Sequence, residues 1–301
     1  MNIEENVILK QFTTFKCGGP ARYFAEPATV EELTELMNYA KSNGLKVLIL
    51  GLGSNMLISD DGFDGLVIRI GKKMGDISFE DDGEYKTITA SAGCSLAWFG
   101  MRCALESLEG GEFCCGIPGT IGGAVFMNAG AYGREIKDIA VEVTYLLDGE
   151  VLKISAEECN FGYRKSIFEQ MEKDGRKPVI IALKARLKKG DKDQIQSYVA
   201  ELKAKRSASQ PIDVPSAGST FKRPEGHFAG ALIEGSGLKG FALDDSGAQV
   251  SPKHAGFVVN NGGKASAADV MRLIRYIQDK VYKDSGVRLE TEVRLIGGDG
   301  N

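Results

Sequence analysis

The chain has 301 residues, 43% hydrophobic and 26% charged, so it is long enough for two or three packed units. Its formal net charge of −4 provides no general field that would attract nucleic acid or an anionic membrane surface. Residues 1–10 carry acidic side chains, and no apolar run approaches the ~20 residues that span a bilayer. We therefore expect a cytoplasmic protein without nucleic-acid binding or membrane insertion. The sequence does not fix the oligomeric state, and a monomer is expected.

The cysteines and histidines do not form a metal-binding pattern. The six cysteines are scattered without a Cys-x-x-Cys pair, and only His227 and His254 could complete a metal site. We therefore expect no metal, and interpret the cysteines as buried, reduced thiols. Glycine is unusually frequent, because 38 of the 301 residues are glycine, well above the average glycine content of about 7%. Glycine allows a backbone to approach another group closely, which directs attention to the glycine-rich segments.

Helices, strands and glycine loops alternate along the chain. Thr29 begins a helix with a capping-box pattern, and Gly44 ends it. Ser266 caps a second helix whose apolar positions form one stripe. Strict alternation over residues 287–296 predicts a half-buried closing strand. Further helices are expected at 95–108 and 194–207, and strands at 46–50, 66–70, 85–92, 141–147 and 179–187. Two prolines in residues 210–215 indicate a domain boundary, and the pattern predicts an α+β fold.

Residues 51–55, Gly-Leu-Gly-Ser-Asn, directly follow a predicted strand. Their backbone N–H groups and serine hydroxyl could hold a phosphate. The segment is neither a Walker loop, because no Gly-Lys-Ser/Thr follows, nor a Rossmann fingerprint, because the third glycine and the helix are missing. Taken alone, it could equally be a tight turn.

Residues 116–133 form a longer stretch of glycine and small residues. The stretch is too long for a turn and too poor in side chains for a core, so we expect its backbone to line a ligand. Small residues would allow a pyrophosphate and a flat ring to approach closely. The alternative is a glycine-rich crossing between strands.

Six motifs follow one another along the chain: Gly-Leu-Gly-Ser-Asn (51–55), Ile-Pro-Gly-Thr-Ile-Gly-Gly (117–123), Asn-Ala-Gly-Ala-Tyr-Gly (128–133), Phe-Gly-Tyr-Arg-Lys-Ser (161–166), Ala-Gly-Ser (217–219) and Leu-Glu-Thr-Glu-Val-Arg (289–294). In this order they resemble the UDP-N-acetylenolpyruvoylglucosamine reductase family, and the resemblance extends from Thr13 to Gly297. The short span between the tyrosine-arginine and serine motifs resembles the type II form.

The resemblance implies an FAD-binding fold of the vanillyl-alcohol oxidase/PCMH type in two subdomains, plus a third α+β substrate-binding domain. We expect residues 1–70, joined by the C-terminal strand 287–301, to form the first FAD-binding subdomain. Residues 71–207 would form the second, and residues 208–286 the substrate-binding domain. The residues implied to hold FAD are Gly51, Gly53, Ser54, Asn55, Gly116, Ile117, Pro118, Gly119, Thr120, Gly122, Gly123, Asn128, Gly130 and Ala131.

The implied activity is reduction of UDP-N-acetylglucosamine enolpyruvate to UDP-N-acetylmuramate in peptidoglycan synthesis, with NADPH and FAD. Arg164 matches the arginine that binds the enolpyruvyl carboxylate, which a planar guanidinium can hold bidentately. Ser219 matches the serine that protonates the enol carbon. Glu292 matches the carboxylate that acts with Arg164, because it directly precedes the Val293-Arg294 pair. Outside this resemblance, Arg164 would be a surface side chain and Ser219 a turn residue.

Several polar side chains are further candidates for the UDP-sugar site. They are Tyr132, Tyr163, Arg206, Lys222 and Arg223. One branch of the family has asparagine at position 223, so the substrate contacts there depart from that branch. Cys114 and Cys115 precede the flavin loop, but we interpret them as packing residues and expect non-covalent FAD. Two alternatives stay open: another FAD oxidoreductase of the same fold, and a sugar-nucleotide-binding protein without redox chemistry.

Overall fold

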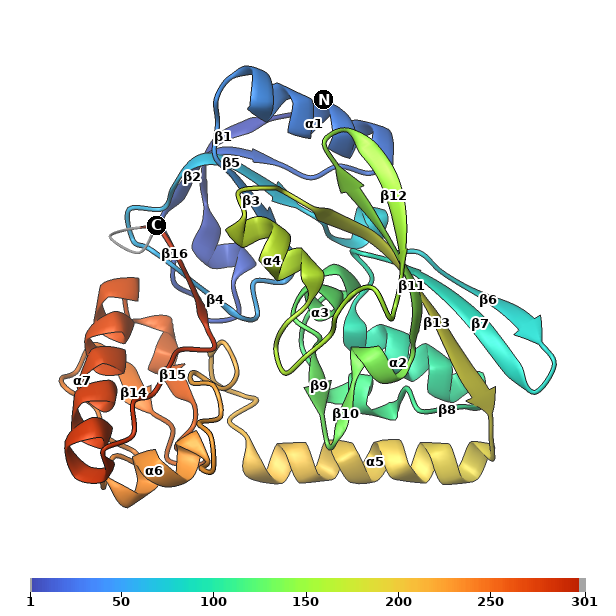
Figure 1. Cartoon of the computed structure of the whole chain (residues 1–301). Helices are drawn as coiled ribbons and strands as arrows, with labels where there is room; N and C mark the ends of the chain where they lie inside the picture. The colour runs from blue at the N-terminus through green and yellow to red at the C-terminus, as the bar shows by residue number, and fades with distance from the viewer. Residues whose placement is uncertain (1, 298–301) are drawn as a thin grey trace. The chain divides into compact units, whose positions relative to one another are not determined.

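The computed structural model describes residues 2–297 and divides into two compact units, whose elements are labelled in Figure 1. The first unit contains residues 2–3, 25–51 and 68–205. The second contains residues 4–24, 52–67 and 206–297. Each unit is therefore assembled from segments that are distant in the sequence. The last residues of the predicted segment 287–301, residues 298–301, lie outside the described part of the chain.

An antiparallel sheet forms the centre of the first unit, with strand order β12-β11-β13-β7-β6 and β8 beside β13. Alternate residues of its long central strand are buried, as expected where one face of a sheet covers a core. Val143, Leu183 and Ile88 are completely buried on three neighbouring strands. The strands are β6 (Ile77–Asp82), β7 (Tyr85–Ser91), β8 (Leu108–Glu109), β11 (Ala140–Leu147), β12 (Glu150–Ser155) and β13 (Val179–Lys189).

The helices α1 and α2 of the first unit begin at the capping residues Thr29 and Ser95, which the sequence identifies. Thr29 Oγ1 accepts from the Glu32 N–H at 3.2 Å, and the Glu32 carboxylate accepts from the Ala28 N–H at 2.7 Å. The helices are α1 (Val30–Ser42), α2 (Leu96–Leu105), α3 (Ile121–Phe126), α4 (Ile167–Lys173) and α5 (Lys192–Ser209), whose last residues belong to the second unit. Short elements complete the unit: β3 (Val47–Leu50), η2 (Lys72–Met74), η3 (Glu112–Gly116), β9 (Gly130–Ala131), β10 (Arg134–Glu135) and η4 (Ile136–Asp138).

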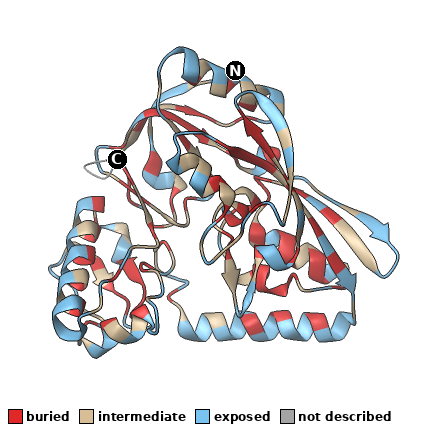
Figure 2. Cartoon of the chain, viewed as in Figure 1, coloured by how far each residue is buried: buried red, intermediate tan, exposed pale blue. Residues whose placement is uncertain are grey.

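The second unit packs α7 (Ala267–Ser285) over a core of its own. The predicted apolar stripe is confirmed, because Val270, Leu273, Ile274, Ile277 and Val281 are all completely buried, whereas the opposite face of the helix is exposed (Figure 2). The other elements are β1 (Glu4–Ile8), η1 (Leu9–Phe12), β2 (Pro20–Ala25), β4 (Met56–Ile58), β5 (Phe63–Arg69), α6 (Ala229–Gly235), β14 (Ala248–Val250), β15 (Val258–Asn260), η5 (Asn261–Gly263) and β16 (Arg294–Ile296).

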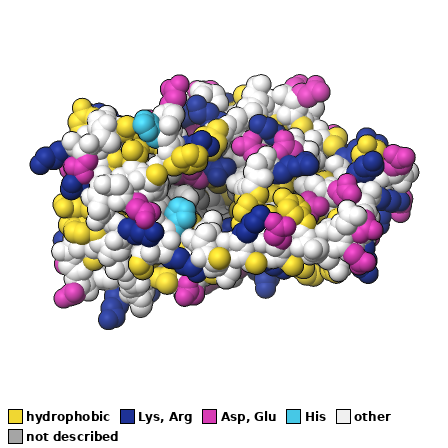
Figure 3. All heavy atoms as spheres, turned by 90° about the horizontal axis from the view of Figure 1, so that it is seen from below, with side chains coloured by type: hydrophobic (Ala, Val, Ile, Leu, Met, Phe, Trp, Pro, Cys, Tyr) yellow, Lys and Arg dark blue, Asp and Glu magenta, His cyan; other side chains and the backbone are white. Residues whose placement is uncertain are grey.

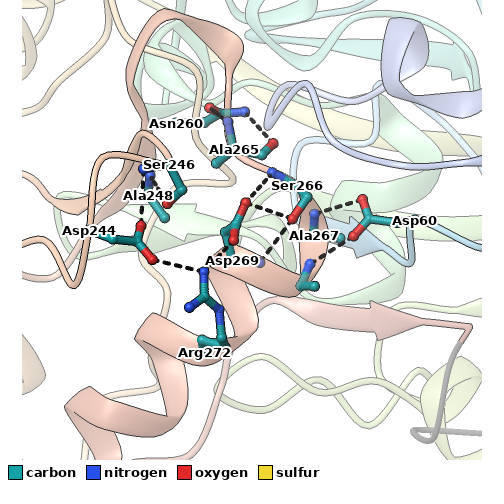
Figure 4. A network of polar contacts seen from close by, with 11 residues as sticks. Asp60, Asp244, Ser246, Ala248, Asn260, Ala265, Ser266, Ala267, Asp269 and Arg272 are labelled. Atoms are coloured by element: carbon teal, nitrogen blue, oxygen red, sulfur yellow. Dashed lines mark hydrogen bonds and ion pairs between the residues drawn. The ribbon is translucent and has the colours of Figure 1, made fainter.

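A polar network fixes the N-terminus of α7 (Figure 4). Ser266 and Asp269 form the expected capping box. Asp60, which follows β4, accepts from the N–H groups of Ala267 at 2.8 Å and Ala268 at 2.9 Å. Four donors at this helix end are thereby satisfied by side chains, and the negative Asp60 carboxylate also suits the positive end of the helix.

Two sequence predictions are corrected by the structure. The closing strand predicted at 287–296 is limited to β16, which pairs in parallel with β4. Its earlier part forms no regular ladder, since the Glu292 and Val293 N–H groups both point to one carbonyl, that of Thr220. The sequence predicts that segment 116–133 is too poor in side chains to contribute to a core, but the segment contains α3, whose Ile121 and Val125 are completely buried.

Candidate flavin and substrate site

The two glycine-rich motifs contribute residues that meet in the first unit. A Cβ atom added to Gly51 would lie 2.5 Å from Thr120 Oγ1, which is closer than real Cβ contacts. Glycine at position 51 therefore allows the end of β3 to approach the segment before α3. Gly53 belongs to the second unit and has a positive φ of 59°, and a Cβ there would lie 2.6 Å from the Phe12 carbonyl oxygen. Both glycines are thus required by close backbone packing.

The segment before α3 has donor groups that suit a phosphate. The N–H groups of Ile121 and Gly122 donate to the carbonyls of Cys94 and Ala92, both at 2.9 Å. Within residues 2–297, by contrast, the N–H groups of Gly119 and Thr120 donate to no protein acceptor, although Thr120 is buried. Buried N–H groups are normally paired. Adjacent N–H donors beside small residues fit a diphosphate, so this segment fits the cofactor FAD.

The predicted residues Asn128, Gly130 and Arg164 are brought together in the first unit. Asn128 is completely buried, and its Nδ2 donates to the Gly162 carbonyl at 3.0 Å. It thereby holds the turn that carries Tyr163 and Arg164. Arg164 has a positive φ of 53°, and its Nη2 donates to the Gly130 carbonyl at 3.4 Å. The guanidinium carbon also lies 5.2 Å from the Tyr163 ring centroid. Its orientation is therefore set by several contacts.

Ser219 and Glu292 are brought together in the second unit by Thr220, the residue that follows Ser219. Glu292 donates its backbone N–H to the Thr220 carbonyl at 2.9 Å. Phe221 and Thr291 form a bridge between the same two segments. Ser219 is exposed and Glu292 is partly exposed. The predicted proton donor and the predicted carboxylate therefore lie on adjacent, hydrogen-bonded segments.

Thr220, which joins these two segments, was not singled out from the sequence. It is completely buried, its N–H donates to the Gly256 carbonyl at 2.9 Å, and its Oγ1 accepts from the Val258 N–H at 2.9 Å. A threonine beside a serine in a glycine-rich stretch has no sequence signal that separates it from other turn residues.

The predicted substrate side chains have diverse surroundings. Lys222 Nζ lies 3.3 Å from Glu290 Oε2 in an exposed ion pair. Arg223 stacks on Phe228 at 4.0 Å, and Phe228 is 62% exposed. Tyr132 is 40% exposed and donates its hydroxyl to the Leu202 carbonyl at 3.3 Å in the first unit. Arg206 lies in the last turn of α5.

Cys114 and Cys115 lie buried in η3, close to Gly100. Burial raises the pKa of Cys115 to about 11 and the pKa of Cys114 well above its usual value. Both thiols are therefore protonated at neutral pH, consistent with packing residues. Among residues 2–297, no group of three or more His, Cys, Asp or Glu side chains could hold a metal ion.

The charges on the face seen from below are mixed, because Lys and Arg side chains alternate with Asp and Glu across it (Figure 3). No helix in the described part of the chain is long and apolar enough to cross a membrane.

The fold and the phosphate-suited loop are those of an FAD-binding oxidoreductase. Residues 21–155 match the family model described as an FAD binding domain. Residues 210–296 match the C-terminal domain of UDP-N-acetylenolpyruvoylglucosamine reductase. The chain belongs to the UDP-N-acetylenolpyruvoylglucosamine reductase family.

The similarity to individual relatives extends over almost the full chain. The chain is 47% identical to the UDP-N-acetylenolpyruvoylglucosamine reductase of Agathobacter rectalis, covering 96% of this chain and 92% of the relative. It is 43% identical to that of Clostridioides difficile, covering 97% and 92%. The crystal structure of the Thermus caldophilus reductase matches with a TM-score of 0.82 and 34% identity over 99% of this chain and 100% of that chain. The expected flavin-binding fold, FAD cofactor and membership among reductases of peptidoglycan synthesis are thereby confirmed.

Proposed function

We propose that the chain reduces UDP-N-acetylglucosamine enolpyruvate to UDP-N-acetylmuramate with NADPH as the reductant. FAD, when bound, would carry hydride from NADPH to the enolpyruvyl double bond. Gly119, Thr120 and the other residues predicted from the two glycine motifs would hold it. The three-part division, with residues 208–286 as the substrate-binding domain, is part of this proposal.

The chain's own residues would bind the substrate and handle one proton. Arg164 would bind the enolpyruvyl carboxylate, since a guanidinium matches a carboxylate bidentately and stabilises charge that develops beside it. Ser219 Oγ would donate a proton to the carbon next to that carboxylate. Glu292 would stabilise the same developing charge together with Arg164. Tyr132, Tyr163, Arg206, Lys222 and Arg223 remain predicted contacts of the UDP-sugar.

The observation that best supports this proposal is the hydrogen bond of 2.9 Å between Glu292 N–H and the Thr220 carbonyl. It joins the serine segment to the glutamate segment, so a hydroxyl donor and a carboxylate lie on neighbouring backbones.

The decisive experiment measures NADPH oxidation at 340 nm with and without the enolpyruvyl UDP-sugar, and identifies the product by mass spectrometry. We expect substrate-dependent oxidation and a product two hydrogens heavier than the substrate. NADPH oxidation that depends only on oxygen would instead support another flavin oxidoreductase. Binding of the UDP-sugar without any NADPH oxidation would support a binding protein.

A further inference from the structure

The peptide groups of Glu292 are held on both sides. On one side its N–H donates to the Thr220 carbonyl at 2.9 Å. On the other, Asn55 Nδ2 donates to the Glu292 carbonyl at 3.1 Å. Arg294 N–H also donates to the Asn55 carbonyl at 3.0 Å, which continues the parallel pairing of β16 with β4. Asn55 therefore contacts the closing segment through both its backbone and its side chain.

The Thr220 side of this arrangement is a firm anchor. Thr220 is completely buried, and its N–H, hydroxyl and carbonyl groups are all hydrogen-bonded. A buried and fully paired group has little freedom to move. The Asn55 amide holds the Glu292 peptide from the other side.

We propose that Asn55 is a positioning residue that acts through Glu292, in addition to its place in the glycine motif of residues 51–55. Its amide fixes the backbone of the glutamate and so connects this motif to the carboxylate that handles charge on the substrate. The inference rests on the proposed role of Glu292. An amide nitrogen is required, because the acceptor is a carbonyl oxygen and a carboxylate at position 55 could not donate to it.

The test compares the two half-reactions by stopped-flow absorbance in Asn55→Ala and Asn55→Asp. We expect flavin reoxidation by the enolpyruvyl UDP-sugar to slow by about 10- to 100-fold at saturating substrate, since small misplacement of a reacting group has effects of this size. Both half-reactions are measured in protein saturated with FAD, because Asn55 also lies in the motif predicted to hold this cofactor. Flavin reduction by NADPH should slow much less than reoxidation.

Gln278→Ala is the matched control. Gln278 Nε2 donates to the Leu289 carbonyl at 2.9 Å, so it also ties the closing segment by an amide-to-carbonyl bond, but three residues before Glu292. We expect Gln278→Ala to lose about as much thermal stability as Asn55→Ala, but its flavin should be reoxidised at the normal rate. Equal slowing by both changes would mean that the segment needs only general anchoring, and would overturn a specific role for Asn55.

A double-mutant cycle tests whether Asn55 acts through Glu292. If it does, Asn55→Ala combined with Glu292→Gln should reoxidise no more slowly than Glu292→Gln alone. Additive slowing, or equal slowing of both half-reactions in the FAD-saturated Asn55 variants, would assign Asn55 to another function and overturn the proposal. Normal reoxidation in Glu292→Gln would instead refute the proposed role of Glu292. Slow reoxidation in Glu292→Gln together with normal reoxidation in Asn55→Ala would refute only the positioning role of Asn55.

Discussion

Lys222 and Glu290 form an ion pair with 3.3 Å between Nζ and Oε2, and their side chains are 44% and 76% exposed. The pair lies beside a main-chain bond in which the Lys222 N–H donates to the Glu290 carbonyl at 2.9 Å. Glu290 thus pairs with Lys222 at the surface, and Glu292, whose N–H donates to the Thr220 carbonyl, is less exposed. This difference in surroundings separates two glutamates that spacing alone could not separate.

We expect Glu292→Gln to reduce flavin reoxidation by the enolpyruvyl UDP-sugar sharply, because glutamine keeps the shape but removes the charge. Glu290→Gln should cost much less, since an exposed ion pair contributes only about 0 to 1 kcal/mol. Stopped-flow reoxidation of both variants, at equal flavin content, checks this. Slow reoxidation in Glu290→Gln together with normal reoxidation in Glu292→Gln would reverse the assignment of the two glutamates.

Ser219→Ala should remove the proton donor while leaving its anchored neighbour Thr220 in place. Flavin reduction by NADPH should persist, and reoxidation by the substrate should slow by the ~10²- to 10⁴-fold typical of a lost general acid. The two rates are measured separately by stopped-flow absorbance. Equal slowing of both half-reactions would indicate that Ser219 shapes the pocket instead.

The fold was predictable where local signals agree with packing. The Ser266 capping box and the apolar stripe of α7 predicted the helix correctly, because one sequence period determines both features. The alternation at 287–296 predicted a longer strand than β16. A strand also needs a neighbouring strand whose hydrogen-bonding groups match its own, and here the N–H groups of Glu292 and Val293 share the Thr220 carbonyl.

The site could be predicted only by resemblance to a family, and its residues stay predictions. Arg164, Ser219 and Glu292 were proposed in this way, and no spacing rule relates positions that are 55 and 73 residues apart in the printed sequence. Thr220 and the second contact of Asn55 were not predictable, because both depend on tertiary hydrogen bonds between distant segments. The type of a side chain does not predict which backbone group it will contact.

FAD should be released by mild denaturation, because the buried thiols of Cys114 and Cys115 stay protonated at neutral pH and are poor nucleophiles. Trichloroacetic acid precipitation followed by absorbance of the supernatant checks this. Flavin that stays with the precipitated chain would contradict it, and Cys115→Ser would then show whether that thiol is the attachment point.

The capping box of α7 should give a pH-dependent stability. Hydrogen bonds from Ser266, with a contribution from Arg272, lower the pKa of Asp269. A carboxyl with a lower pKa in the folded state stabilises the protein above its unfolded pKa of about 3.9, and this contribution is lost as pH falls through the folded value.

Asp269→Ala should therefore lower the free energy of unfolding by about 1 kcal/mol at pH 7, the usual size of a cap, with a smaller difference as pH falls below about 4. Urea unfolding at several pH values measures it. Asp284→Asn, which alters an exposed ion pair with Lys280 and a hydrogen bond with Ser236, should cost less than Asp269→Ala. A pH-independent difference for Asp269→Ala would contradict the expectation.

Asn128 connects the flavin motif to the turn that carries Arg164. Its Nδ2 donates to Glu135 Oε2 and to the Gly162 carbonyl, both at 3.0 Å, and its Oδ1 accepts from the Lys137 N–H at 3.0 Å. The side chain is completely buried, so removing it leaves several groups without their partner.

Asn128→Ala should lower the free energy of unfolding by about 1 to 3 kcal/mol, the cost of unpaired buried groups. Because the turn with Arg164 loses its anchor, flavin reoxidation by the substrate should slow more than flavin reduction by NADPH. The matched control is Asn160→Ala. Asn160 has the same positive φ of 47° but is exposed, so this change introduces the left-handed backbone strain alone. Denaturant unfolding and stopped-flow reoxidation are measured for both variants. If Asn128→Ala unfolds as readily as Asn160→Ala and reoxidises at the parent rate, the buried amide does not hold the arginine turn.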